Sequence, residues 1–197
     1  MRVLVGCEES GVVREAFRAK GHDAWSNDII PARDNGPHIL GDVFEAINMY
    51  NWDLIILHPP CTALSVSGNK TYGAGKEKNY LRKESLIWTK ELFEQAKIKA
   101  TIGVCLENPV GVLWKYLDET PQYVQPWMFG HTEQKKTGLL LHNLPRLHPT
   151  NNVYEEMMKL PRKEREKIFY MSPSKDRGKE RSVTYKGIAE AMAEQWG

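Results

Sequence analysis

The feature that most constrains the fold of this chain is a short apolar run that ends in two prolines. Residues 54–57 are continuously apolar, which is typical of a strand buried on both faces of a parallel sheet. Pro59 and Pro60 then fix two φ angles and remove two backbone donors, so the strand ends stiffly. We therefore expect Cys61 at the carboxyl edge of the sheet, where open α/β sheets build their sites. The alternative is a buried structural cysteine behind a proline turn.

Strand-like and helix-like segments alternate along the chain, which predicts an α/β, Rossmann-like fold with a mostly parallel sheet. Residues 65–78 are rich in Gly, Ser and Lys without periodicity, which indicates a mobile loop. The expected strands are 2–5, 24–26, 39–40, 54–57 and 102–106, the expected helices are 12–20, 79–97 and 187–196, and segments 124–129 and 138–141 should form an antiparallel hairpin.

The length of 197 residues suits a single domain spanning 1–197. The three cysteines, Cys7, Cys61 and Cys105, contain no CxxC pair, so neither a disulfide framework nor a zinc site is implied and a cytoplasmic location is expected. The apolar opening runs directly into Glu8 and Glu9, which predicts neither a signal peptide nor a membrane span.

Positive charge gathers near the C-terminus, although the formal net charge is only +2. Residues 159–186 contain ten Lys and Arg side chains against four acidic ones. From charge alone, a solvated surface and a contact with nucleic acid are equally good interpretations.

Three acidic residues follow expected strands: Asp28 the second, Asp42 the third and Glu107 the fifth. In dinucleotide-binding folds an acid after the second strand accepts hydrogen bonds from a ribose. For each residue taken singly, an N-cap or turn role is the competing interpretation.

The first turn supplies glycines but also negative charge. Its residues are Gly6, Cys7, Glu8, Glu9, Ser10 and Gly11, which do not form GxGxxG. The two glutamates would repel a pyrophosphate, whereas a cofactor carrying an ammonium group would tolerate them. This favours S-adenosylmethionine over NAD or ATP.

Taken together, these motifs resemble the DNA cytosine-5 methyltransferase family, particularly its short phage and prophage members. Residues 53–65 are similar to the family's Pro-Pro-Cys motif, Glu107-Asn108 to its Glu-Asn motif, and residues 134–136 to its Gln-x-Arg motif. The opening turn with Asp28 and Asp42 resembles the cofactor motifs. The resemblance implies a class I S-adenosylmethionine-dependent methyltransferase fold and methylation of cytosine C5 in DNA.

The resemblance also implies roles in catalysis. Cys61 would add to C6 of the base, since C5 is not nucleophilic before that addition, and its pKa should need only modest lowering. Glu107 would bind N3 and the exocyclic amine and supply a proton, its pKa raised by burial. Asn108 would hold the turn, and Lys136 would replace the family arginine at the cytosine O2.

For the cofactor, the resemblance implies that Asp28 binds the ribose, Asp42 the adenine amine and Ile29 the adenine face. The remaining expected cofactor residues are Gly6, Glu8, Ser10, Gly11 and Pro59.

The chain also departs from the family. His58 replaces a glycine, Gly138 replaces a second motif arginine, and no long target-recognition region is present. Residues 144–182 would form a reduced, basic recognition segment that contacts DNA and reads a short or relaxed sequence. Two alternatives remain: cytosine methylation of RNA or a free nucleotide, and a non-catalytic homologue that binds cofactor or DNA. The oligomeric state is not predicted.

Overall fold

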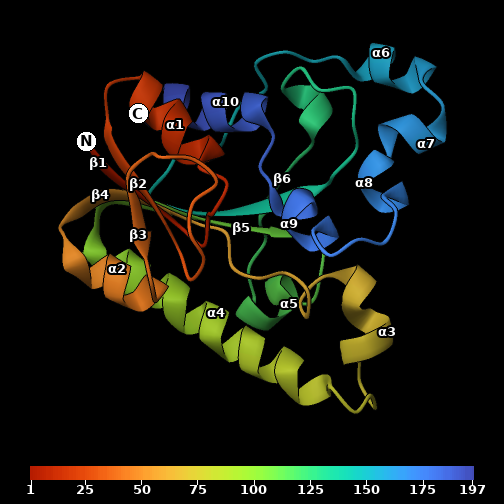
Figure 1. Cartoon of the computed structure of the whole chain (residues 1–197), viewed down its shortest axis with the longest axis horizontal. Coiled ribbons are helices and arrows are strands. Elements are labelled where there is room, and N and C mark those ends of the chain that lie inside the picture. The colour runs from red at the N-terminus through yellow and green to blue at the C-terminus, as the bar shows by residue number, and fades with distance from the viewer.

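A seven-stranded sheet forms the centre of the computed structural model, which describes residues 1–197 (Figure 1). Its order is β3-β2-β1-β4-β5-β7-β6. The first five strands are parallel, whereas β7 runs antiparallel to both β5 and β6, so the mostly parallel α/β sheet is confirmed. The strands are β1 (Arg2–Gly6), β2 (Asp23–Asp28), β3 (His38–Leu40), β4 (Trp52–Leu57), β5 (Ala100–Pro109), β6 (Gln122–Val124) and β7 (Thr137–His142).

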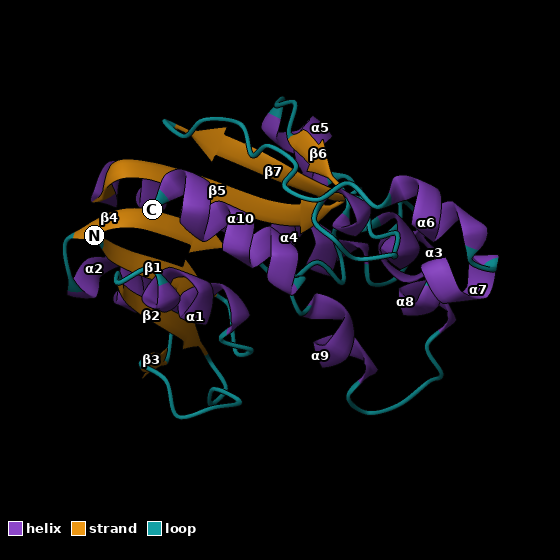
Figure 2. Ribbon diagram, turned by 90° about the horizontal axis from the view of Figure 1, so that it is seen from above, coloured by secondary structure: helices purple, strands orange, loops and turns teal.

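Helices cover both faces of this sheet, with α1 and α10 on one side and α2 and α4 on the other (Figures 1 and 2). None of the helices combines the length and the apolar character needed to cross a bilayer. The helices are α1 (Val12–Ala19), α2 (Val43–Met49), α3 (Asn69–Tyr72), α4 (Asn79–Lys99), α5 (Leu113–Leu117), α6 (Tyr154–Lys159), α7 (Arg162–Arg165), α8 (Lys167–Tyr170), α9 (Arg177–Ser182) and α10 (Lys186–Trp196), with 3-10 turns η1 (Val66–Gly68) and η2 (Pro126–Met128).

The apolar run of β4 is continuous because the strand contributes to two cores. Leu54 and Ile56 enter the core that α1 and α10 cover, whereas Ile55 and Leu57 enter the core that α2 and α4 cover. All four side chains are fully buried. The two-sided burial expected from the sequence is therefore confirmed, since successive residues of a strand face opposite sides.

Several elements differ from the sequence-based expectation. The segment 65–78, expected to be a mobile loop, contains η1 and α3. The segment 124–129 leaves the sheet after Val124, because Pro126 cannot continue the ladder and begins η2 instead. Helices α2, α5 and α6 to α9 were not expected. Both α4 and α10 lie where their apolar spacing places them, and Gly21 has the positive φ (86°) typical of a residue just past a helix.

A fully buried arginine ties α1 to the loop that follows β2. The Arg14 guanidinium donates to Ser26 Oγ at 2.8 Å, to Glu15 Oε1 at 2.9 Å and to both carboxylate oxygens of Asp34. A Cβ atom at Gly36 would lie within 2.8 Å of the guanidinium, so the loop approaches it closely only because this residue is glycine. The contact fixes the carboxyl end of β2, where an expected cofactor residue lies.

We predict that Arg14→Ala lowers the free energy of unfolding by about 3 kcal/mol, because the buried Ser26 hydroxyl loses a donor and a cavity replaces the guanidinium. Asp34 is 41% exposed, so solvent screens its ion pair with Arg14 and reduces what that pair contributes to stability. Urea unfolding would measure the change. The matched control is Arg18→Ala on the same helix, whose side chain is 39% exposed and should cost less than about 1 kcal/mol. Equal losses in the two variants would contradict the role given to Arg14.

Candidate active site

The turn that carries Cys61 is held by hydrogen bonds on both of its sides. The Asn108 side chain, only 1% exposed, donates from Nδ2 to the Pro59 carbonyl at 3.0 Å. The Cys61 carbonyl accepts from the amides of Leu64 and Ser65 at 3.0 and 2.9 Å. The cysteine therefore follows the strand on a fixed path, and Asn108 holds the turn from the neighbouring strand β5.

His58 and Glu107 lie together because β4 and β5 are parallel neighbours in register. Ile56 pairs with Cys105 and both enter the α1/α10 core, so residues two positions further on continue the same face. His58 Nδ1 lies 3.2 Å from Glu107 Oε2, and the side chains are 8% and 17% exposed. Glu107 thus lies beside the proline turn, because the carboxyl ends of the parallel strands β4 and β5 meet at the same edge of the sheet.

The ionisation of Glu107 differs from the expectation. Burial raises the pKa of this carboxyl, but the hydrogen bond and charge of His58, with the charge of Lys135, bring its pKa below the usual range. The expected rise is therefore wrong for this state of the protein. The pKa is lowered mainly by the imidazole of His58, which follows a neighbouring strand. At neutral pH Glu107 is therefore a carboxylate.

The pKa of Cys61 also moves away from what its expected role requires. Burial is the larger cause of its raised pKa and the negative charge of Glu107 is the second, while Lys135 and Arg181 act in the opposite direction. Cys61 is therefore a thiol at neutral pH, not a group that needs only modest activation. Its activation has to accompany a change in these charges or in hydration.

Two adjacent lysines have different surroundings. The Lys136 ammonium lies 4.3 Å from the centre of the Tyr123 ring and its side chain is exposed. Lys135 instead donates to the Val183 carbonyl at 3.2 Å, and its charge acts on both Cys61 and Glu107. The structure therefore brings Lys135, not Lys136, to the candidate active site. Sequence reasoning missed it because the connection before β7 gives no register.

The carboxyl ends of β1 and β2 form the second part of the site. Cys7 has φ of 59°, an uncommon conformation for a side-chain-bearing residue. Burial raises its pKa to about 12, with contributions from Asp28 and Asp42, which places this thiol near both carboxylates. Sequence reasoning passed over Cys7, although it directly follows Gly6 in the opening turn.

Apolar side chains flank these acids. Ile29 is 78% exposed and Leu40 is 61% exposed, although both adjoin the sheet edge. Asp42 caps α2 by accepting from the Phe44 amide at 2.7 Å, so its N-cap interpretation is confirmed. Exposed apolar groups beside carboxylates suit an adenosine, whose hydroxyls and amine donate and whose ring is flat. These residues therefore fit the expected cofactor.

The opening turn also stabilises α1. Glu8 is buried, and its carboxylate accepts from the amides of Val13 and Arg14 at 2.7 and 3.3 Å and from Ser10 Oγ at 3.2 Å. Burial raises the pKa of Glu8, and these hydrogen bonds act against that rise. Gly11 has φ of 73° at the start of the helix. The glutamate thus lies at the positive end of a helix, where the chain itself compensates its charge.

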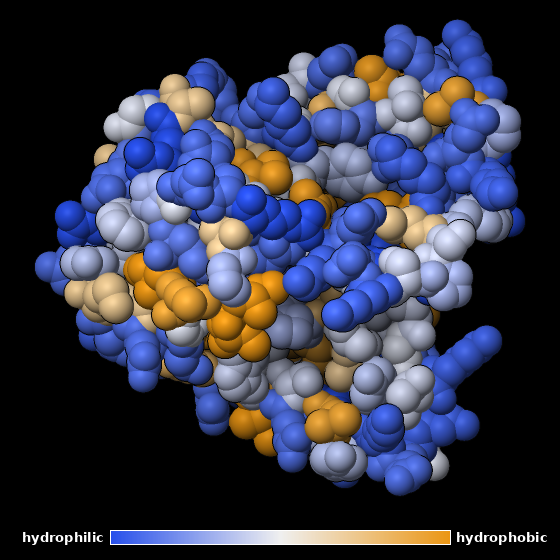
Figure 3. Space-filling model, in the orientation of Figure 1, coloured by the Kyte–Doolittle hydropathy of each residue, from blue (hydrophilic) through white to orange (hydrophobic).

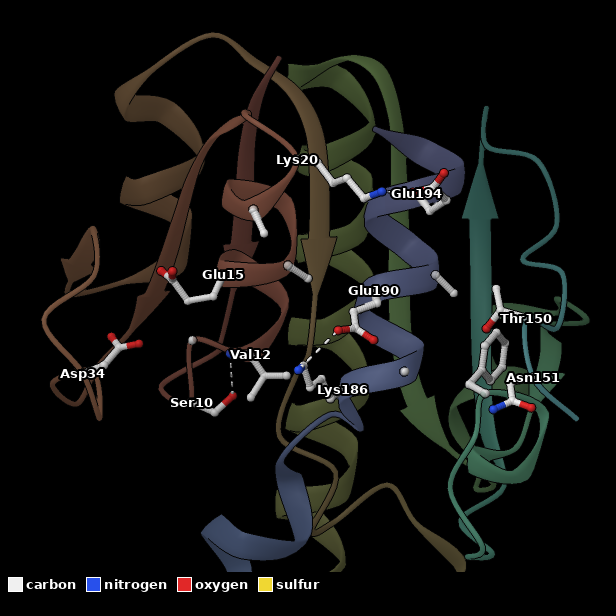
Figure 4. A pocket seen from close by; sticks show the side chains of 16 residues that line it. Ser10, Val12, Glu15, Lys20, Asp34, Thr150, Asn151, Lys186, Glu190 and Glu194 are labelled. Atoms are coloured by element: carbon white, nitrogen blue, oxygen red, sulfur yellow. Dashed lines mark hydrogen bonds and ion pairs between the residues drawn. The ribbon is translucent and has the colours of Figure 1, made fainter. Parts of the chain in front are cut away.

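A large cavity lies elsewhere, between α1 and α10, with a volume of about 860 Å³ (Figure 4). It includes Ser10 and Gly11 from the opening turn but neither Cys61 nor Glu107. Carboxylates border it: Glu15, Asp34, Glu190 and Glu194. Its size alone does not make it the active site, because Cys7, Cys61 and Glu107, whose pKa values are perturbed, lie at the strand ends and do not line this cavity.

Comparison with known proteins gives similarities to solved structures alone, with 56 matching chains. No family model and no curated protein matches the sequence. A prophage-encoded E. coli protein, proposed to be a DNA modification methyltransferase, is similar with 16% identity and a TM-score of 0.47. The match covers 82% of this chain and 56% of the other, so this chain spans little more than half of that protein's length. A similarity at this level carries no information on activity.

We predict that Glu107→Gln lowers the pKa of Cys61, because the substitution removes a negative charge that raises it. The rate of Cys61 alkylation by iodoacetamide, followed by peptide mass spectrometry, should then rise at lower pH than in the wild type. Lys135→Met should move the profile toward higher pH. The exposed residue Glu119 offers the control, since Glu119→Gln should change nothing. A profile unmoved by both site substitutions would exclude this electrostatic coupling.

Proposed function

We propose that the protein is an S-adenosylmethionine-dependent methyltransferase that methylates C5 of cytosine in DNA through a covalent bond between Cys61 and C6. The observation that carries the proposal is the juxtaposition of a cysteine on a rigid Pro-Pro turn and a glutamate at the end of the adjacent strand. A hydrogen bond from Asn108 to the Pro59 carbonyl joins the two motifs. This arrangement supplies a nucleophile, Cys61, and a carboxyl group, Glu107, that can hydrogen-bond the edge of the base.

The sheet supports the fold part of the proposal. Its strands are parallel up to β5 and end in an antiparallel pair, as a class I methyltransferase fold with a terminal hairpin requires. Cofactors in open α/β sheets bind outside the carboxyl ends of the strands, which is where Asp28 and Ile29 lie.

When bound, the cofactor would supply an electrophilic methyl group beside the base. Asp28 and Asp42 would accept hydrogen bonds from its ribose and adenine, and Ile29 would cover the adenine. Glu8 would support the cofactor site indirectly, because its carboxylate accepts hydrogen bonds from the first amides of α1.

The chain's own residues would divide the work on the base. Cys61 would form the Sγ–C6 bond after losing its proton, with Lys135 and Arg181 favouring the thiolate. Glu107, once protonated on Oε1, would meet N3 and the exocyclic amine through that oxygen, since Oε2 lies against His58. Lys135 would bind the cytosine O2 in place of Lys136. A base in duplex DNA would have to leave the stack to reach this site.

The basic segment supports DNA as the partner. The upper right part of Figure 3, which corresponds to α6–α8, is largely hydrophilic. Lys163, Lys175 and Lys179 are exposed. The charge of Arg181 on α9 reaches Cys61, so the segment borders the candidate active site. Lysines that surround an active site can bind phosphates without reading sequence.

One observation favours the non-catalytic alternative. In the free protein Cys61 is a thiol and Glu107 a carboxylate, whereas the proposed chemistry uses a thiolate and a protonated acid. A homologue that binds cofactor and DNA without turnover would keep these states.

We predict that DNA containing 5-fluorocytosine traps the wild-type protein as a covalent adduct in the presence of S-adenosylmethionine, because fluorine prevents the elimination that releases Cys61. Denaturing electrophoresis and mass spectrometry would detect it. Cys61→Ala should form no adduct, whereas Cys7→Ala and Cys105→Ala should retain it. A DNA adduct formed by Cys61→Ala would contradict the mechanism. If adducts form with RNA or a free nucleotide but not with DNA, that molecule and not DNA is the substrate.

We also predict that reversing two charges, Lys163→Glu with Lys175→Glu, weakens DNA binding at least about tenfold and reduces the salt slope by about two, since each phosphate contact releases counterions. Fluorescence anisotropy at several salt concentrations would measure both. The matched control reverses Lys90 and Lys99, which are also exposed and lie on α4. Equal effects of the two pairs would mean that DNA binds through another surface.

A further inference from the structure

His58 lies at the centre of the carboxyl edge, between two strands. Its backbone amide donates to the Gly6 carbonyl at 2.9 Å, which continues the β1–β4 pairing by one residue. Its Nδ1 lies 3.2 Å from Glu107 Oε2. The His58 side chain is only 8% exposed, and its Nε2 has no hydrogen-bond partner in the protein. Such a buried polar ring is costly to place, which argues for a specific task.

Charged groups face this imidazole from several elements. Glu8 approaches from the turn after β1 and Glu107 from β5. Lys135, in the segment before β7, acts on Glu107. His58 acts on both carboxyl groups, lowering the pKa of each against the opposing effect of burial. Cys61 lies three residues further along the same turn.

The two oxygens of Glu107 are not equivalent. Oε2 lies against His58, whereas Oε1 has no hydrogen bond within the protein and is not among the buried atoms that lack a partner. Oε1 is therefore the oxygen that remains accessible at the end of β5. No other donor in the protein contacts Oε2, so His58 supplies the one hydrogen bond that orients the carboxylate.

We propose that His58 is a positioning residue for Glu107: it holds Oε2 and thereby directs Oε1 toward the base. This inference rests on the function proposed above. His58 itself touches no reacting atom and acts through the carboxylate, since a terminal carboxyl torsion is otherwise broad and roughly two-fold. The charge of Glu8 also acts on the ring, without a hydrogen bond to it.

The variants His58→Ala and His58→Gln test this inference. His58→Ala should lower kcat by about 10- to 100-fold with KM for DNA nearly unchanged, because a misplaced group costs rate more than binding. His58→Gln keeps a donor for Oε2 and should recover part of the rate. His148→Gln, at an exposed histidine, is the control and should match the wild type.

A second readout does not depend on turnover. Because His58 lowers the pKa of Glu107, both variants should raise it, so the carboxyl protonates at higher pH than in the wild type. Carbon-13 NMR of glutamate-labelled protein, with Glu107→Gln to assign the signal, would follow this titration. If His58→Ala does not fold, His58→Gln gives the same test.

The outcomes separate the two proposals. A raised Glu107 titration with a lower kcat supports the positioning role. An unmoved titration, or an unchanged kcat in an active enzyme, overturns it. The Glu107 titration could move as expected while the wild type methylates no nucleic acid or nucleotide. That result overturns the proposed function and, with it, a catalytic role for the His58–Glu107 contact.

Discussion

The pairing of β4 with β5 is the constraint on which the candidate active site depends. The two strands are parallel neighbours, so their carboxyl ends meet at the same edge of the sheet. One end carries the proline turn and Cys61, and the other carries Glu107 and Asn108. The hydrogen bond from Asn108 to the Pro59 carbonyl then fixes the distance between the motifs. A shift of register by one residue would turn Glu107 to the opposite face of the sheet.

Burial makes this edge an electrostatically coupled site. Glu8 and Glu107 are mostly removed from water, and each is compensated by a group that the fold brings to it: the start of α1 for Glu8 and the imidazole of His58 for Glu107. For Cys61 the charges of Lys135 and Arg181 compensate only in part, and burial with the charge of Glu107 keeps it a thiol. The proposed chemistry therefore requires that a bound base and DNA change these charges, and such coupling would confine reactivity to the complex.

The sequence contained enough to place the main parts of this site. Prolines after an apolar run located the strand end, a glutamate at the end of another strand located its partner, and the apolar spacing of α10 located the last helix. Asp42 with Glu45 three residues later also carried the signal of a helix start, which would have predicted α2. The catalytic and cofactor roles remain proposals.

Other features depend on contacts that local patterns do not encode. The choice between Lys135 and Lys136 follows from the register of β7, and the direction of the Glu107 pKa follows from a histidine 49 residues away. The short helices α6–α9 alternate with loops in a charged segment, without the long apolar period that identifies α4 and α10.

The most direct test of the central claim is the identity of the methylated nucleoside. The protein would be incubated with isotopically labelled S-adenosylmethionine and DNA, and the DNA digested to nucleosides and analysed by mass spectrometry. Labelled 5-methyldeoxycytidine that depends on Cys61 is the predicted product. A label on an exocyclic amine of cytosine or adenine, or 5-methyldeoxycytidine formed equally by Cys61→Ala, would contradict the account.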